Sequence, residues 1–286
     1  MKYICKGAVG DQVDITLVDV GHTYTVKGLP SDMSLTSMPS VTKLVHDLDG
    51  SASMPLQRWG IARALEVIEA GGDIPTARAT PEKLFKQSGE RGTQVHRMLE
   101  QFLKHELLTA GTLITPDQEL VEHFNSIEKF LGDWRIRGLE MRVFHPQSRI
   151  GGSIDIMASR CVDGEVEIFV CDLKTGKSVR KPNDFFQVSC YVHCLAEMLR
   201  LGIEIWNGCF DEIENDLSNV TYSGGLIHLH GVPQCGYDSC NCTPSDRKLS
   251  FHAVPDEMLA DGGNLLIAMR MINEMRRIRV PRKVTL

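Results

Sequence analysis

Residues 151 to 178 read "GGSIDIMASRCVDGEVEIFVCDLKTGKS" and contain two apolar runs separated by "VDG". Both runs are short, rich in β-branched or aromatic residues and bounded by Gly or Asp, which predicts two consecutive strands over 151–159 and 165–174. Asp155 lies inside the first run, and Asp172 and Lys174 end the second. Charged residues in such runs need partners, so this stretch predicts both a sheet and a site on it.

Side-chain alternation indicates which of these residues share a face. It predicts Ile154 and Ile156 on one face of the first strand and Asp155 on the other, while Asp172 and Lys174, at i and i+2, leave the same face of the second strand. If the two strands are neighbours, both carboxylates and the ammonium converge. Taken singly, each of these three charged residues could also lie at a strand end or where the strand leaves the sheet toward solvent.

Two carboxylates held close together raise each other's pKa, so a protein that builds such a pair usually supplies a cation. Magnesium favours oxygen ligands and is commonly held by one or two carboxylates together with a substrate phosphate. Such an ion orients a scissile phosphate and activates the attacking water, and Lys174 can position that water or neutralise developing charge. The pattern favours metal-dependent phosphodiester chemistry, with a metalloenzyme of unrelated chemistry as an alternative.

The periodicity of the remaining sequence predicts an α/β fold with a helical N-terminal half. Residues 14–28 alternate as a hairpin, and a strand is expected over 139–146. Two further strands, over 224–232 and 248–255, are expected to form a second hairpin. Helices are expected over 40–48, 54–72, 91–105 (after a short helix and a glycine break), 115–134, 182–202 and 255–277.

Length and composition bound the class of protein. A chain of 286 residues with 42% hydrophobic residues fits one large α/β domain, and no run of about 18 apolar residues predicts a membrane span. Four cysteines lie within apolar runs, which is typical of reduced core thiols and of a cytoplasmic protein. They are Cys161, Cys171, Cys190 and Cys194.

The net charge of -6 argues against a nucleic-acid partner, but basic residues are concentrated in two places. Lys177, Arg180 and Lys181 lie at or just after the end of the opening stretch, and the tail "RMINEMRRIRVPRKVTL" contains Arg276, Arg277 and Arg279. These groups are either solvated surface or contacts to a DNA backbone.

Motifs in order along the chain carry a family resemblance. "GSID", then "CDLK", then "QVSCY" resemble the RecB-like branch of the PD-(D/E)XK nuclease superfamily, and "ERGTQVHRMLEQFL" is similar to its Gly-Thr-x-x-His-x-x-x-Glu helix. "HTYTVKG", "MPSVTKLVHDL" and "WGIARALE" are similar to the N-terminal part of a subgroup that contains phage exonucleases and the mitochondrial genome maintenance exonuclease. The similarity covers roughly residues 20 to 200.

The resemblance implies a restriction-endonuclease-like core, with a small mixed sheet flanked by helices, in a single nuclease domain over 1–286. Residues 1–135 would form its N-terminal hairpin and helical part, and residues 136–286 its core and C-terminal helix. The implied activity is a Mg²⁺- or Mn²⁺-dependent DNA exonuclease that prefers single-stranded ends, in a bacterial or phage-infected cell. An endonuclease of the same superfamily, or a non-catalytic DNA-binding protein working with replication or recombination proteins, is the alternative.

The resemblance also implies roles for particular residues. His96, Asp155, Asp172 and the carbonyl of Leu173 would hold the metal, and Lys174 would assist the water. Gln187 and Tyr191, at i and i+4 on one helix face, would border the site, although core packing explains them equally. Glu100 would lie behind His96 or be an ordinary surface acid. Glu140 would be a metal-site acid or a salt-bridge partner of Arg137 or Arg142.

The segment "PQCGYDSCNCTPSD" places Cys235, Cys240 and Cys242 close together, downstream of His228 and His230. Some members of the superfamily carry a four-cysteine iron-sulfur cluster. The spacing here matches no standard zinc pattern and lacks a fourth cysteine, which favours a loop with free thiols over a metal site.

Overall fold

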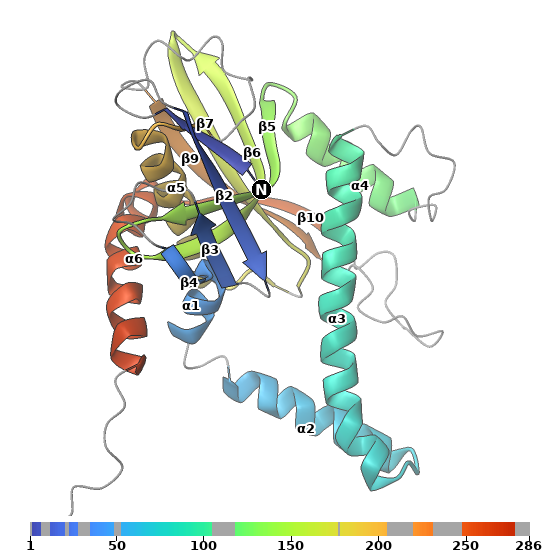
Figure 1. Ribbon diagram of the computed structural model, residues 1–286. Coiled ribbons are helices and arrows are strands. Elements are labelled where there is room, and N and C mark those ends of the chain that lie inside the picture. The colour runs from blue at the N-terminus through green and yellow to red at the C-terminus, as the bar shows by residue number, and fades with distance from the viewer. Residues whose placement is uncertain are drawn as a thin grey trace, which may run out of the picture.

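The computed structural model describes residues 2–6, 12–20, 23–27, 35–48, 53–104, 118–176, 178–204, 220–230 and 248–277. Within these ranges the chain forms six helices and ten strands in two sheets, which confirms a mixed α/β fold (Figure 1). No helix in the described ranges has the length and hydropathy needed to span a membrane.

The larger sheet has the strand order β10-β9-β7-β6-β5 and contains the two predicted central strands. β5 (Arg135–His145), β6 (Ile150–Val162) and β7 (Glu165–Lys174) form an antiparallel meander. β7 pairs in parallel with β9 (Val220–His230), which pairs antiparallel with β10 (Lys248–Ala253) as the predicted second hairpin. The sheet is therefore mixed, and β6 and β7 are neighbours.

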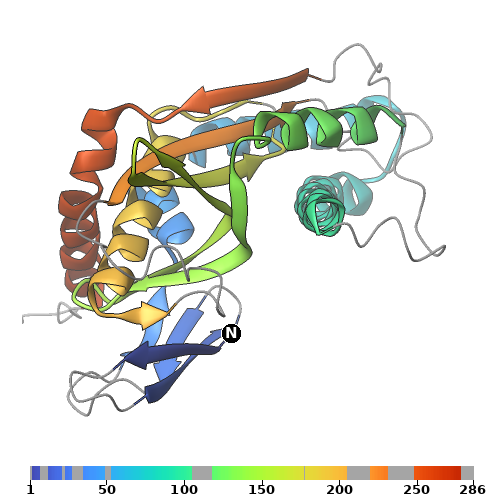
Figure 2. The same cartoon turned by 90° about the horizontal axis from the view of Figure 1, so that it is seen from above.

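Helices cover both faces of this sheet (Figures 1 and 2). On one face α5 (Asn183–Arg200) packs in a cluster with α6 (Asp256–Arg277) and β5. On the other face α3 (Ile74–Leu103) and α4 (Gln118–Phe130) bury a second apolar cluster. The predicted helices over 115–134, 182–202 and 255–277 thus correspond to α4, α5 and α6.

The N-terminal part holds a second, smaller antiparallel sheet with the order β4-β3-β2-β1-β8. β2 (Gln12–Val20) and β3 (Thr23–Lys27) form the predicted opening hairpin. The prediction missed β1 (Lys2–Lys6), β4 (Leu35–Pro39) and β8 (Ile203–Glu204), because each is too short to show a clear alternation. The N-terminal half is therefore mixed rather than helical.

Two helices follow the small sheet: α1 (Val41–Leu48) and α2 (Ser53–Glu69), both close to their predicted bounds. The predicted glycine break in the next helix is wrong, because α3 runs unbroken through Gly89 and Gly92. A glycine costs a helix about 1 kcal/mol relative to alanine but keeps both backbone hydrogen-bonding groups, so a long helix tolerates it. A Cβ on Gly92 would lie 3.1 Å from Oγ1 of Thr175, so the glycine allows α3 to approach the end of β7 closely.

The predicted alternation along β6 is interrupted at Asp155. Ile154 packs in the cluster on the α5 face, whereas Ile156 packs in the cluster on the α3 and α4 face, so the prediction that they share a face is wrong. Along β6, pairing with β7 begins only at Ile156. On the neighbouring strand β5, Glu140 has a φ of 49°, a left-handed conformation that strains a residue with a Cβ. Both features mark an irregular segment of the sheet that strand periodicity cannot predict.

The prediction of reduced core thiols is confirmed for Cys171, Cys190 and Cys194, which are buried and free. It is wrong for Cys161, which is exposed near the end of β6, where the strand extends beyond the covering helices. Burial raises the pKa of Cys190 to about 12, so this thiol stays protonated and packs as an apolar group.

Gly152 is required by close packing, since a Cβ on it would lie 2.4 Å from Cε1 of Tyr191. We expect Gly152→Ala to lower the free energy of unfolding by ~1–3 kcal/mol, because the rigid tyrosine ring must shift within a filled core. Gly89→Ala is the matched control: a Cβ at Gly89 would have no described atom within 4 Å, and the substitution should stabilise α3 by about 0.5–1 kcal/mol. Urea unfolding monitored by circular dichroism measures both; equal stability of the Gly152 variant and the parent would contradict the packing argument.

Candidate functional site

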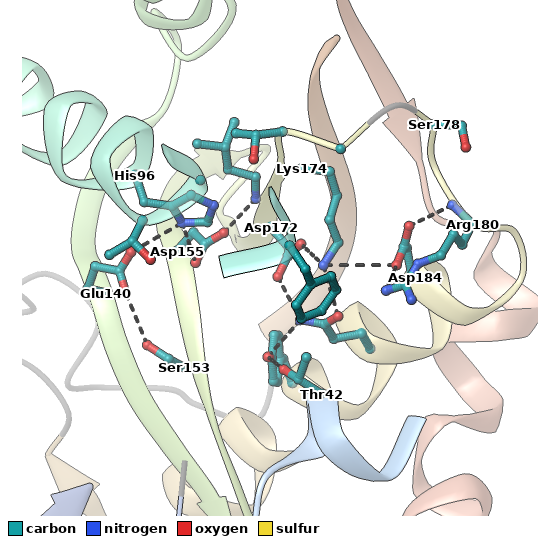
Figure 3. A pocket seen from close by; sticks show the side chains of 18 of the residues that line it. Thr42, His96, Glu140, Ser153, Asp155, Asp172, Lys174, Ser178, Arg180 and Asp184 are labelled. Atoms are coloured by element: carbon teal, nitrogen blue, oxygen red, sulfur yellow. Dashed lines mark hydrogen bonds and ion pairs between the residues drawn. The ribbon is translucent and has the colours of Figure 1, made fainter. Parts of the chain in front are cut away.

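A cavity of about 800 Å³ lies between α3, the adjoining ends of β6 and β7, and the start of α5 (Figure 3). It brings together predicted residues from segments far apart in the sequence. Its lining includes His96, Glu140, Asp155, Asp172, Leu173, Lys174, Arg180, Gln187 and Tyr191. The roles of these residues remain predictions, but their convergence is a feature of the fold.

His96, Glu140 and Asp155 form one cluster at the α3 side of the cavity. Nδ1 of His96 lies 3.4 Å from Oδ1 of Asp155 and 3.5 Å from Oε1 of Glu140. One potential ligand atom from each residue lies within 4.8 Å of the other two. Buried Val95 and Leu99 anchor this part of α3 and so aim His96 at the strands.

Electrostatics indicate that this cluster needs a positive charge. Burial opposes protonation of His96, but the charge of Asp155 and hydrogen bonds to Asp155 and Glu140 outweigh it and raise the pKa of the imidazole to about 11. A proton on His96 therefore balances the carboxylates when nothing else does. A metal ion would supply that charge instead.

Asp155 also joins the two central strands. Its Oδ2 accepts a hydrogen bond of 2.6 Å from the backbone N–H of Leu173, at the point where ladder pairing between β6 and β7 has ended. The side chain thereby replaces a missing backbone partner and leaves Oδ1 facing His96. Leu173 itself buries its side chain in the cluster under α3 and α4.

Asp172 and Lys174 form an ion pair of 2.7 Å next to this cluster, on the same face as predicted. The amide of Gln187 orients both residues: Nε2 donates to Oδ1 of Asp172 at 2.9 Å, and Oε1 accepts from Nζ of Lys174 at 2.9 Å. Nε2 also donates to the hydroxyl of Tyr191 at 2.8 Å. Since every polar atom of Gln187 is engaged, the orientation of its amide is defined.

Each member of the ion pair stabilises the charge of the other against burial. Burial raises the pKa of Asp172, against the opposing charge of Lys174, to about 6. Burial opposes the charge of Lys174, but Asp172 and Asp184 outweigh it and raise its pKa. Apart from the ion pair, Oδ2 of Asp172 is buried without a hydrogen-bond partner among the described residues, so it retains a lone pair for a further cation.

The structure adds three residues that sequence reasoning missed. Asp184 is buried, accepts from the backbone N–H of Arg180 at 2.6 Å and lies 4.0 Å from Lys174. Thr42 on α1 shares a hydrogen bond of 3.1 Å with the hydroxyl of Tyr191, and Ser153 donates to Glu140 at 3.4 Å. Asp184 had a sequence signal, because it precedes Gln187 by three residues on the same helix face; Thr42 and Ser153 had none.

Other predicted residues lie at the edge of this constellation, outside it or outside the described structure. Glu100 lines a small second cavity with His96, Glu140 and Asp155, and its carboxylate forms an ion pair of 2.7 Å with Lys104, the residue that caps α3. The ammonium of Lys181 lies 5.0 Å from the ring centroid of Phe185. His228 contacts the carbonyl of Gly176 at 2.8 Å. Lys177, Arg279, Cys235, Cys240 and Cys242 lie outside the described residues, as do the side chains of His230, Arg276 and Arg277.

The charges along the cavity fit a divalent cation. The described lining contains four carboxylates, those of Glu140, Asp155, Asp172 and Asp184, against the permanent cations Lys174 and Arg180. The donors of the cluster are two carboxylates and one imidazole, a set that binds Mn²⁺ well and Mg²⁺ through its oxygens. Without a cation, this surplus of negative charge would repel a phosphate.

No protein-family model matches this chain, and no curated protein matches its sequence. The chemistry of the site is therefore the basis for inferring a function.

Proposed function

We propose that this protein is a metal-dependent deoxyribonuclease with a restriction-endonuclease-like core of the RecB-like kind. The observation that carries the proposal is the placement of the His96, Glu140 and Asp155 cluster beside the Asp172 and Lys174 ion pair in one cavity. A metal-binding cluster next to a positioned ammonium is suited to hydrolysis of a phosphodiester.

The arrangement of elements supports the same proposal. The antiparallel strands β5, β6 and β7 are followed by α5 and then by β9 in parallel with β7, a mixed sheet flanked by helices. The site lies where β6 and β7 stop pairing. On their other sides the two strands still pair with β5 and β9, so the side chains of the site are carried by an ordered backbone.

His96, Glu140 and Asp155 would hold the metal, with Asp172 adjoining them. When bound, Mg²⁺ or Mn²⁺ supplies Lewis-acid polarisation of the phosphate and activation of water. Glu140 accepts from Ser153 and Asp155 accepts from Leu173, so both carboxylates are oriented before any ligand arrives. Such preorganisation lowers the cost of assembling the site.

Lys174 would neutralise charge on the scissile phosphate or hold the attacking water. Its ammonium has three donors, of which Asp172 and Gln187 engage two, leaving one to face the cavity. Tyr191 would act through Gln187 rather than on substrate, because its side chain is buried and its hydroxyl is bonded to Gln187 and Thr42. Burial also raises the pKa of its phenol well above the usual value. Arg180, held by Asp184, would contact a neighbouring phosphate.

The experiment that tests the proposal compares end-labelled linear single strands, linear duplexes and a closed circle, each with Mg²⁺, Mn²⁺ or EDTA. For an exonuclease that prefers single-stranded ends, we expect degradation of the linear single strand to exceed that of the duplex, an intact circle, and no cleavage in EDTA. Gel electrophoresis of the labelled products measures all three.

The alternatives correspond to distinct outcomes of this assay. Rapid cutting of the circle would indicate an endonuclease and not an exonuclease. DNA binding without metal-dependent cleavage of any substrate would indicate a non-catalytic DNA-binding protein. Full activity of Lys174→Ala on a substrate other than DNA would indicate a metalloenzyme of unrelated chemistry.

A further inference from the structure

An aromatic ring that belongs to neither apolar cluster of the described residues lies on the wall of the cavity. Phe85 on α3 lines the same cavity as His96, yet it is 60% exposed. Leaving an aromatic side chain in water forgoes about 1.5–3 kcal/mol of burial free energy. Single exposed apolar residues are common on protein surfaces, but this one borders a candidate catalytic centre.

The spacing along α3 connects Phe85 to the metal-binding cluster. Phe85, Gly89, Gly92 or Thr93, and His96 recur at intervals of three or four residues and so lie along one stripe of the helix. Eleven residues of helix rise by ~16 Å, which separates Phe85 from His96. Between them Gly89 has no Cβ, and even an added one would meet no described atom within 4 Å, so a polymer backbone can approach the helix closely there.

We propose that Phe85 is a stacking platform for an unpaired base of single-stranded DNA whose scissile phosphate lies at the His96, Glu140 and Asp155 cluster. The inference rests on the proposed nuclease function and deepens it by naming a residue that selects single strands. A base within a duplex is already paired and stacked on both faces, so only a splayed base can present a face to an isolated ring. Every base has such a face, so this selection would be nearly independent of sequence.

The charges of the cavity agree with this placement of the strand. The cluster needs a cation before a phosphate can enter, whereas around Phe85 the acids Glu82 and Glu90 are matched by Lys83 and Lys86, so that part of α3 has no surplus of negative charge. Lys86 lies next to Phe85 with its side chain 77% exposed and pairs only loosely, at 3.9 Å, with Glu90. A strand crossing from Phe85 to the cluster would thus meet a stacking surface first and the reacting centre second.

A binding experiment with Asp172→Asn as the background tests the stacking without cleavage. Fluorescently labelled oligo(dT) strands carry one abasic nucleotide at successive positions, and fluorescence anisotropy in Mg²⁺ measures their affinity. With Phe85 present, we expect one abasic position to weaken binding by about 5- to 100-fold. With Phe85→Ala, affinity for the intact strand should fall by a similar factor and the abasic position should have no further effect.

Three matched variants separate stacking from apolar contact and from general damage to α3. Phe85→Trp should retain or increase affinity, whereas Phe85→Leu, which keeps apolar area without a flat ring, should resemble Phe85→Ala. Ile74→Ala removes a side chain that is 76% exposed on the same helix and outside the cavity lining, and it should bind like the parent. Because Phe85 is exposed, unchanged melting curves are expected for its variants.

The outcomes distinguish this inference from the proposed function. If the wild-type protein degrades DNA but the abasic penalty persists in Phe85→Ala, or Phe85→Leu binds as tightly as the parent, the stacking role is wrong and the nuclease stands. If the abasic penalty depends on Phe85 but no metal-dependent cleavage occurs, the stacking role stands and the nuclease falls. If no strand binds and the wild-type protein cleaves no DNA, both are overturned.

Discussion

Replacing Asp172 by Asn should reduce the rate of DNA cleavage by about 10²- to 10³-fold, the usual loss when one preorganised electrostatic group is removed from a catalytic centre. Asp172 is 3% exposed and forms the ion pair that holds Lys174 in place. Asparagine has the same shape and can still accept from Gln187, but it lacks the charge that balances the ammonium and attracts a metal. We therefore expect the cleavage rate to fall far more than the fraction of folded protein.

Single-turnover cleavage of a labelled single strand in saturating Mg²⁺ measures this effect, per folded molecule and well below the melting temperature. Glu197→Gln is the control, because Glu197 lies on the same helix α5 but pairs with Arg200 outside the cavity, so its rate should stay within about 2-fold of the parent. Since removing one partner from a buried pair also destabilises a protein, Lys174→Gln is assayed in parallel. Wild-type rates in both cavity variants would refute the assigned site.

The second large effect concerns metal affinity, which is measured without any substrate. Asp155→Asn should weaken Mn²⁺ binding by about 100-fold or more. Loss of a group that only orients a ligand typically lowers metal affinity by about 10- to 100-fold, and loss of a direct ligand should lower it at least as much. Asparagine retains an oxygen acceptor for the N–H of Leu173, so the connection between β6 and β7 persists. Isothermal titration calorimetry of the pure protein with Mn²⁺ measures the change.

Two variants make this measurement discriminating. Glu140→Gln should weaken Mn²⁺ binding comparably, because Glu140 belongs to the same three-residue cluster. Glu100→Gln should have a clearly smaller effect than Glu140→Gln, because Glu100 lines a small cavity beside His96 but directs its carboxylate to Lys104 and is not one of the three clustered residues. A reversed order, with Glu100 important and Glu140 neutral, would show that the metal lies on the other side of His96.

The central strands and the helix that follows them were predictable because their signals are local. Alternation over 165–174 correctly placed Asp172 and Lys174 on one face, and the i and i+4 spacing placed Gln187 and Tyr191 on one face of α5. Such periods of 2 and 3.6 residues are properties of a short segment. Local periodicity was therefore sufficient to predict the type of element that carries each of these four residues, whereas the proposal of Gln187 and Tyr191 for the site came from the family resemblance.

The tertiary structure decided which remote residues meet. His96 reaches Asp155 and Glu140 because α3 continues through its glycines and packs across the sheet, and Thr42 reaches Tyr191 from 149 residues away. The positive φ of Glu140 and the interrupted alternation at Asp155 break the strand pattern where the cluster forms. Local periodicity contains no information about register between distant segments or about strained backbone, so the composition of this site is settled only when the chain packs.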